Sequence, residues 1–133
     1  MFKKVLIANR GAVAARLVKA LRTMGVASVA AHSEADAALP YVAEADEARL
    51  IGPPPAPQSY LNQEAILDAA RQTGADAIHP GYGVLSENPE FATKVIEAGP
   101  TFIGPAPKRR KLMGDKTPSK QPRAKKGLPG SPT

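Results

Sequence analysis

The segment KVLIANRGAVAARLVKALRTMG, residues 4–25, decides the fold class of this 133-residue chain. Its apolar run, Val5–Ala8, is four residues long, which is typical of a buried strand in a parallel sheet. From Gly11 to Met24, large apolar residues recur at helical spacing with basic residues between them. Gly25 stands where a helix C-cap favours glycine. The segment therefore predicts a strand, a turn and a helix, which together open a βαβ unit.

The same alternation continues along the chain. We expect further strands at residues 28–31, 48–51, 76–79 and 101–104, and further helices at residues 40–45, 63–73, 89–98 and 107–113. Four prolines between Gly52 and Pro57 predict an extended loop, because proline lacks the backbone N–H that regular structure needs. Strands and helices in this order favour an α/β fold: an open parallel sheet of about five strands with helices on both faces.

Composition excludes several classes of site. The length suits one domain. The chain has no cysteine, which excludes disulfides and a thiol nucleophile, and its two histidines are too few for a histidine-based metal site. The apolar run near the N-terminus stops at Asn9 and Arg10, so it is too short for a signal peptide or a membrane span. We therefore expect a cytoplasmic protein that does not bind membranes.

The net charge of +6 is unevenly distributed. Residues 1–107 carry nine Lys or Arg and eleven Asp or Glu, whereas residues 108–133 carry nine Lys or Arg and a single acid, Asp115. A basic arm is one signature of nucleic-acid binding, and binding through residues 108–126 would be salt-sensitive. This arm has no aromatic residue to stack on a base, so we expect no nucleic-acid partner. Residues 117–133 are rich in proline and glycine, and we expect them to be disordered.

Unusual residues follow three of the expected strands, where open α/β sheets bind ligands. After the first strand, Gly11 could present free N–H groups to an anion at a helix start, or Arg10 could simply bond neighbouring groups in a tight turn. After the fourth strand, two glycines flank Tyr82 and project it over the sheet edge. There His79 is either a backbone-bonded histidine, the commoner outcome, or a catalytic base. After the basic helix, Lys116 could bind a phosphate or be a solvated surface lysine.

Seven segments of this chain together resemble a known family. They are KVLIANRG (4–11), ADE (45–47), SYLN (59–62), AIHPGYG (77–83), LSEN (85–88), FIGP (102–105) and MGDK (113–116). In this order and spacing they are similar to biotin carboxylases. These are the subunits or domains that come first in acetyl-CoA, propionyl-CoA, methylcrotonyl-CoA and pyruvate carboxylases. The resemblance covers residues 1–116 and implies a Rossmann-like domain that precedes an ATP-grasp fold.

The resemblance implies an activity and its site residues. Biotin carboxylases use ATP, bicarbonate and Mg²⁺ or Mn²⁺ to carboxylate biotin held on a carrier protein. By this resemblance Lys116 contacts ATP, and Tyr82 lies beside the biotin pocket in a loop that His79, Gly81 and Gly83 hold. A biotin carboxyl carrier protein and a carboxyltransferase are the implied partners, and we expect the acetyl-CoA type, which serves fatty acid biosynthesis.

The resemblance also implies a homodimer contact on the first helix, at Arg16, Lys19 and Thr23. Lys19 and Thr23 stand where an arginine and a glutamate are familiar, which puts this contact in doubt. Ala12 likewise replaces a usual glutamate.

The family's metal ligands, glycine-rich lid and catalytic base lie beyond this chain, so we expect no catalytic and no metal-binding residue within it. Two interpretations follow: an inactive N-terminal part of a biotin carboxylase, or a non-catalytic module that docks on a full-length carboxylase or biotin carrier protein.

Overall fold

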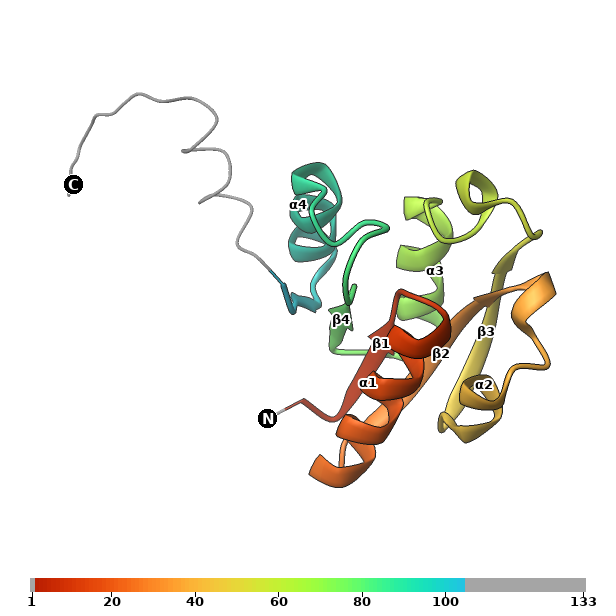
Figure 1. The fold of residues 1–133 in the computed structure, drawn as a ribbon. Coiled ribbons are helices and arrows are strands. Elements are labelled where there is room, and N and C mark those ends of the chain that lie inside the picture. The colour runs from red at the N-terminus through yellow and green to blue at the C-terminus, as the bar shows by residue number, and fades with distance from the viewer. Residues whose placement is uncertain (1, 105–133) are drawn as a thin grey trace, which may run out of the picture.

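Five strands and four α-helices alternate along residues 2–104, the part of the chain that the computed structural model describes. The strands are β1 (Lys4–Ile7), β2 (Ala27–Ser33), β3 (Glu47–Gly52), β4 (Ala77–His79) and β5 (Thr101–Phe102). The α-helices are α1 (Gly11–Met24), α2 (Pro40–Glu44), α3 (Gln63–Thr73) and α4 (Pro89–Ala98), and 3₁₀ helices span Glu34–Asp36 and Ala56–Gln58. All strand pairs are parallel, in the order β3-β2-β1-β4-β5, which confirms the predicted α/β class (Figure 1).

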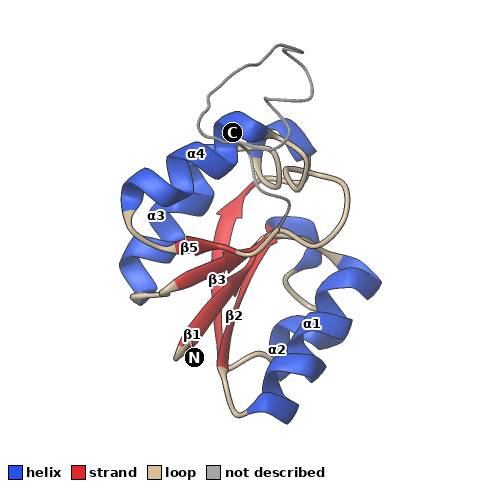
Figure 2. Ribbon diagram, turned by 90° about the vertical axis from the view of Figure 1, so that its left-hand side faces the viewer, coloured by secondary structure: helices blue, strands red, loops and turns tan. Residues whose placement is uncertain are grey.

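Helices cover both faces of the sheet because the central strand is apolar on both sides. In β1, Val5 and Ile7 pack with α1 and α2, whereas Leu6 packs with α3 and α4 on the opposite face. Figure 2 shows these two pairs of helices on either side of the strands. Val5, Leu6 and Ile7 have no exposed surface, and burying such side chains contributes about 1.5 to 3 kcal/mol each. The continuous apolar run of the sequence therefore marks a strand buried on both faces.

Helix ends follow the predicted capping residues. Gly25 adopts φ 74° after α1, a left-handed conformation that glycine reaches without steric cost. Asn62 and Asn88 precede α3 and α4, and each side-chain oxygen accepts a hydrogen bond from a backbone N–H three residues later, at 3.1 Å. These caps fix where α4 begins, and so where the loop between β4 and α4 ends.

Two local predictions were wrong. We predicted a strand through Gly104, but β5 ends at Phe102, because its neighbour β4 ends before Pro80, which has no N–H to continue the ladder. The proline-rich loop contains a 3₁₀ turn at Ala56–Gln58 rather than being extended throughout, since the φ of proline also suits a 3₁₀ turn. The helix predicted at 107–113 and the tail predicted at 117–133 lie outside the described residues.

Candidate functional site

A pocket opens where the direction of the strand order reverses. From β1 the chain passes through α1 to β2 and β3 on one side, and it later crosses to β4 and β5 on the other side. The helix after β1 and the loop after β4 therefore diverge, which creates the crevice where open α/β folds bind ligands. The pocket encloses about 670 Å³. It is lined by α1 (Val13, Arg16, Leu17, Ala20), the loop after β4 (His79, Gly81, Tyr82, Gly83, Ser86, Glu87) and the chain after β5 (Ile103, Gly104).

The loop between β4 and α4 presents Tyr82, whose residue surface is 78% exposed. Gly81 and Gly83 on either side have φ 66° and 65°, and Val84 follows at φ 50°. A β-branched residue in this region is strained, at a cost of about 1 to 3 kcal/mol. Buried Leu85 anchors the far side of the loop. The loop thus holds an exposed aromatic ring at the pocket on a strained backbone.

His79 ends β4 and lines the pocket, where it is half-buried. Its Nδ1 accepts a hydrogen bond from the N–H of Gly81 at 3.1 Å, so the neutral ring carries its proton on Nε2. Burial lowers the pKa of His79 below its ordinary value, which keeps the ring neutral at pH 7. His79 makes the predicted backbone bond, and it also helps to shape the loop that carries Tyr82.

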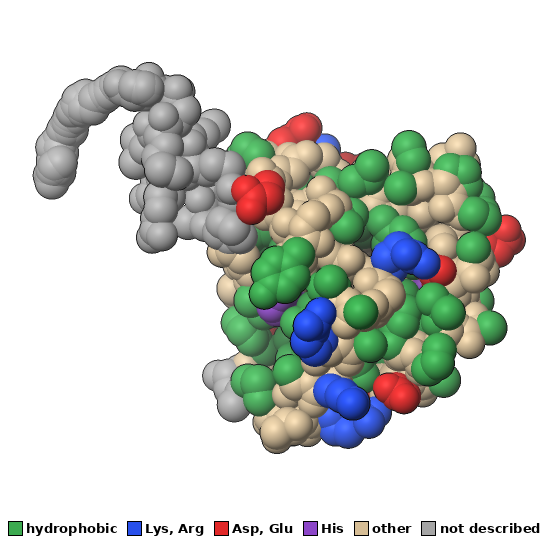
Figure 3. Space-filling view, in the orientation of Figure 1, with side chains coloured by type: hydrophobic (Ala, Val, Ile, Leu, Met, Phe, Trp, Pro, Cys, Tyr) green, Lys and Arg blue, Asp and Glu red, His purple; other side chains and the backbone are tan. Residues whose placement is uncertain are grey.

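The three residues predicted as a dimer contact lie on the exposed side of α1, but only one of them reaches the pocket. Arg16 lines it opposite the Tyr82 loop, whereas Lys19 and Thr23 are not among the lining residues. The Thr23 hydroxyl donates to the backbone carbonyl of Lys19 at 3.1 Å. Between its ends α1 carries Arg16, Lys19 and Arg22 and no acid, and Figure 3 shows basic side chains gathered over this helix. The α1 wall of the pocket is therefore mostly apolar and carries one basic side chain, that of Arg16.

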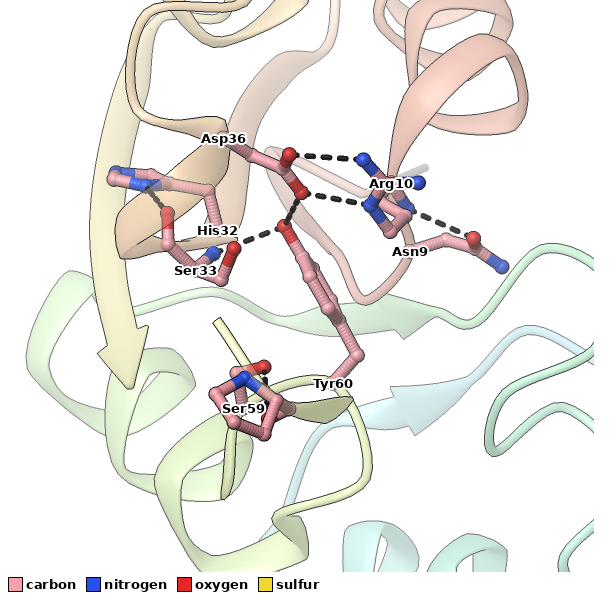
Figure 4. A network of polar contacts seen from close by, with 8 residues as sticks. Asn9, Arg10, His32, Ser33, Asp36, Ser59 and Tyr60 are labelled. Atoms are coloured by element: carbon pink, nitrogen blue, oxygen red, sulfur yellow. Dashed lines mark hydrogen bonds and ion pairs between the residues drawn. The ribbon is translucent and has the colours of Figure 1, made fainter. Parts of the chain in front are cut away.

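The turn after β1 is filled by the protein's own side chains. The guanidinium of Arg10 binds Asp36 through two hydrogen bonds, at 2.7 and 2.9 Å, and the hydroxyl of Tyr60 donates to the same carboxylate at 2.6 Å. The Tyr60 hydroxyl in turn accepts the N–H of Ser33 at 2.9 Å (Figure 4). Hydrogen bonding to Arg10 lowers the pKa of Asp36 to about 2. Of the two interpretations of this turn, the structure supports a tight turn in which Arg10 bonds a neighbouring carboxylate.

Sequence reasoning missed Asp36, Tyr60 and Asn9 as parts of this region. Asp36 follows β2 and Tyr60 follows the proline-rich loop, and no local pattern pairs two residues that lie 24 positions apart. Buried polar residues after strands were the one available signal: Asn9 is 4% exposed and Asp36 is 5% exposed. Buried polar groups need partners, so each marks a specific network.

Within residues 2–104, no group of three or more His, Cys, Asp or Glu side chains could hold a metal ion. Nor does any helix there have the length and apolar character to cross a membrane. Lys116 and the rest of the MGDK segment lie outside the described residues.

Comparisons with known proteins identify relatives of this chain. A family model described as "Biotin carboxylase, N-terminal domain" matches residues 1–109. A biotin carboxylase of Halalkalibacterium halodurans is 49% identical over 132 residues, 99% of this chain and 29% of the relative. One of Allochromatium vinosum is 57% identical over 116 residues, 87% of this chain and 26% of the relative.

A solved structure has a similar fold. The biotin carboxylase domain of a thermophilic 2-oxoglutarate carboxylase, bound to bicarbonate, superposes with a TM-score of 0.80 at 51% identity. The match covers 87% of this chain and 26% of that one. The chain thus spans between a quarter and a third of the length of these relatives.

Proposed function

This chain belongs to the biotin carboxylase N-terminal domain family, and on that premise we propose that it supplies the first domain of an ATP-dependent biotin carboxylase. The whole enzyme would carboxylate carrier-bound biotin with bicarbonate. The observation that carries the proposal is the pocket between α1 and the Tyr82 loop, because it lies at the switch point of the sheet. Its volume falls within the range of small-molecule sites.

The lining residues fit a role beside biotin. Biotin is a small bicyclic molecule with an apolar body, and its ureido nitrogen is the atom that accepts the carboxyl group. Val13 and Leu17 offer apolar surface, and the exposed ring of Tyr82 offers a flat wall. Gly81 and Gly83 carry no side chain that would narrow the space beside that ring. Arg16 adds a positive charge on the opposite wall.

We propose that phosphoryl transfer from ATP needs groups in addition to those that residues 2–104 provide. Phosphoryl transfer depends on metal ions and several positive groups placed around the phosphates. By the family resemblance, Lys116 would supply one such group. Within residues 2–104, no group of three or more His, Cys, Asp or Glu side chains could hold Mg²⁺ or Mn²⁺.

The purified chain is expected to be inactive alone. We expect no bicarbonate-dependent ATP hydrolysis on addition of free biotin, measured as phosphate release, with a full-length biotin carboxylase assayed in parallel as the positive control. Adding the chain to a carboxylase polypeptide that lacks its N-terminal domain is expected to restore hydrolysis, and to do so less well with Tyr82→Ala. Biotin-stimulated hydrolysis by the chain alone would contradict the proposal.

The partners and the acyl acceptor are finer proposals. We expect a biotin carboxyl carrier protein, a carboxyltransferase of the acetyl-CoA type and a cytoplasmic location. The exposed Arg16, Lys19 and Thr23 of α1 are proposed as the dimer contact. Affinity purification tests the proposed protein partners. The acyl-CoA specificity of a carboxyltransferase that co-purifies with the chain identifies which type of carboxylase it serves. Capture of a complete carboxylase at fixed stoichiometry would instead favour the docking-module interpretation.

A further inference from the structure

Asn9 is a buried polar residue between the two halves of the sheet, two positions after the end of β1. We propose that Asn9 is a positioning residue that holds the loop after β4 in the one conformation that presents Tyr82 at the pocket. What the loop is positioned to do rests on the proposed function, but the holding itself follows from the contacts of Asn9.

The carboxamide of Asn9 uses all of its polar atoms on backbone groups. Its Nδ2 donates to the carbonyl of Pro80 at 2.7 Å and to the carbonyl of Tyr82 at 2.6 Å, while its Oδ1 accepts the N–H of Arg10 at 2.8 Å. One NH₂ group thus bridges two carbonyls on either side of Gly81. Only a donor can serve both carbonyls, so a carboxylate of the same shape would set oxygen against oxygen.

The loop backbone packs closely against this bridge at Gly81. A Cβ on Gly81 would lie 2.8 Å from Nδ2 of Asn9 and 2.6 Å from a methyl group of Val13. The loop backbone therefore touches Asn9 directly. On its other side the loop is bound by His79, whose Nδ1 accepts the N–H of Gly81. These contacts offset the strain at Val84, which on its own would favour another loop conformation.

The position of Asn9 is itself fixed from the opposite half of the sheet. The next residue, Arg10, is bound through its side chain to Asp36, which the hydroxyl of Tyr60 also contacts (Figure 4). Asp36 follows β2, whereas Tyr82 follows β4, and β1 lies between these strands. Asn9 therefore links the Arg10–Asp36 pair on the β2 side of β1 to the Tyr82 loop on the β4 side.

Cleavage by chymotrypsin after Tyr82 measures this positioning in the chain as it exists. Tyr82 is exposed, whereas Tyr41 and Tyr60 are each 3% exposed, so cleavage at the latter two reports global unfolding. We expect Asn9→Asp to speed cleavage at Tyr82 by about ten- to a hundredfold, relative to cleavage at Tyr41 and Tyr60, because the loop opens locally. NMR signals of the labelled Tyr82 ring should shift and narrow as well.

The matched control is Asn62→Asp. Asn62 uses its side-chain oxygen as a helix cap, which an aspartate also provides, so the same substitution there should leave the Tyr82 cleavage rate unchanged. If Asn9→Asp does not fold, Gly81→Ala disturbs the same contact from the loop side. It should speed cleavage at Tyr82, relative to cleavage at the two buried tyrosines, by the same factor. Equal acceleration at all three tyrosines, or no acceleration at Tyr82, would overturn the proposal.

A second arm separates this inference from the proposed function. In the intact carboxylase that contains this domain, Asn9→Asp and Tyr82→Ala are both expected to raise KM for biotin at least fivefold, because each weakens one contact with biotin. Both variants should leave KM for ATP within twofold of the wild-type value. If Asn9→Asp frees the loop but neither variant changes KM for biotin, the proposed role of the pocket is wrong while the positioning by Asn9 stands.

Discussion

Replacing Asp36 with alanine is expected to lower the free energy of unfolding by about 2 to 4 kcal/mol. The carboxylate of Asp36 is 5% exposed at the residue level and accepts hydrogen bonds from Arg10 and Tyr60. Without it, the buried hydroxyl of Tyr60 loses its acceptor. The side chain of Arg10 is 53% exposed and regains water, so the loss stays below that of a fully buried ion pair.

Urea unfolding followed by circular dichroism at pH 7 measures this loss. Asp68→Ala is the matched control: Asp68 also pairs with an arginine, Arg71 at 3.1 Å, but its side chain is 54% exposed. Removing this surface pair should change the free energy of unfolding by no more than about 0.5 kcal/mol. Equal losses for the two variants would show that the Asp36 network contributes no more than a surface ion pair.

The same network should make stability depend on pH. Hydrogen bonding to Arg10 lowers the pKa of Asp36 from 3.8 to about 2, so the folded state binds this proton less readily than the unfolded state. The stabilisation is therefore complete above about pH 5 and is lost as the pH falls toward 2. The stability difference between wild type and Asp36→Asn should shrink by about 2 kcal/mol over this range. Parallel pH profiles of the two proteins would contradict this assignment.

Replacing Phe91 with alanine is expected to cost about 3 to 5 kcal/mol of unfolding free energy. Phe91 has no exposed surface and packs α4 on the sheet, where its ring meets Phe102 edge to face with centroids 6.0 Å apart. Alanine would remove this contact and leave a cavity in the core. Because α4 begins directly after the Tyr82 loop, the loss should also loosen the pocket.

Equilibrium unfolding in urea checks the effect of Phe91→Ala. Ile96→Ala on the same helix is the control: Ile96 is 54% exposed, and its replacement should change stability by no more than about 0.5 kcal/mol. If Phe91→Ala does not fold, Phe91→Leu should fold with a loss of about 1.5 kcal/mol, since it keeps most of the volume. A loss below about 1 kcal/mol for Phe91→Ala would mean that α4 does not rely on this residue.

Local sequence signals were sufficient for most of the fold. The run Val5–Ala8 and the helical spacing after Gly11 predicted β1 and α1, and Asn62 and Asn88 were correctly predicted as helix caps. Such signals succeed because hydrophobic period and capping depend on residues within a few positions of one another. The end of β5 was mispredicted because it depends on the length of its neighbour β4, which is not local information.

The candidate site was predictable only in part. The flanking glycines indicated that Tyr82 projects from a tight turn, and the resemblance assigned that turn to a biotin pocket. Arg16 was predicted as a dimer contact, but the structure also brings it to the wall of the pocket. The partners of Arg10 were left open by the sequence, because an arginine in a turn can meet any nearby carboxylate or carbonyl.

The amino-acid sequence alone was enough to predict the α/β class, the family resemblance and the exposed tyrosine loop, since each follows from short local segments and their order along the chain. Tertiary structure alone showed that Asn9 reaches Pro80 and Tyr82, more than 70 positions away, and that Asp36 meets Arg10 and Tyr60. The physical reason is register. The pairing Ile7↔His79 between β1 and β4 decides which side chains face each other at the strand ends, and that pairing follows from how the whole sheet packs.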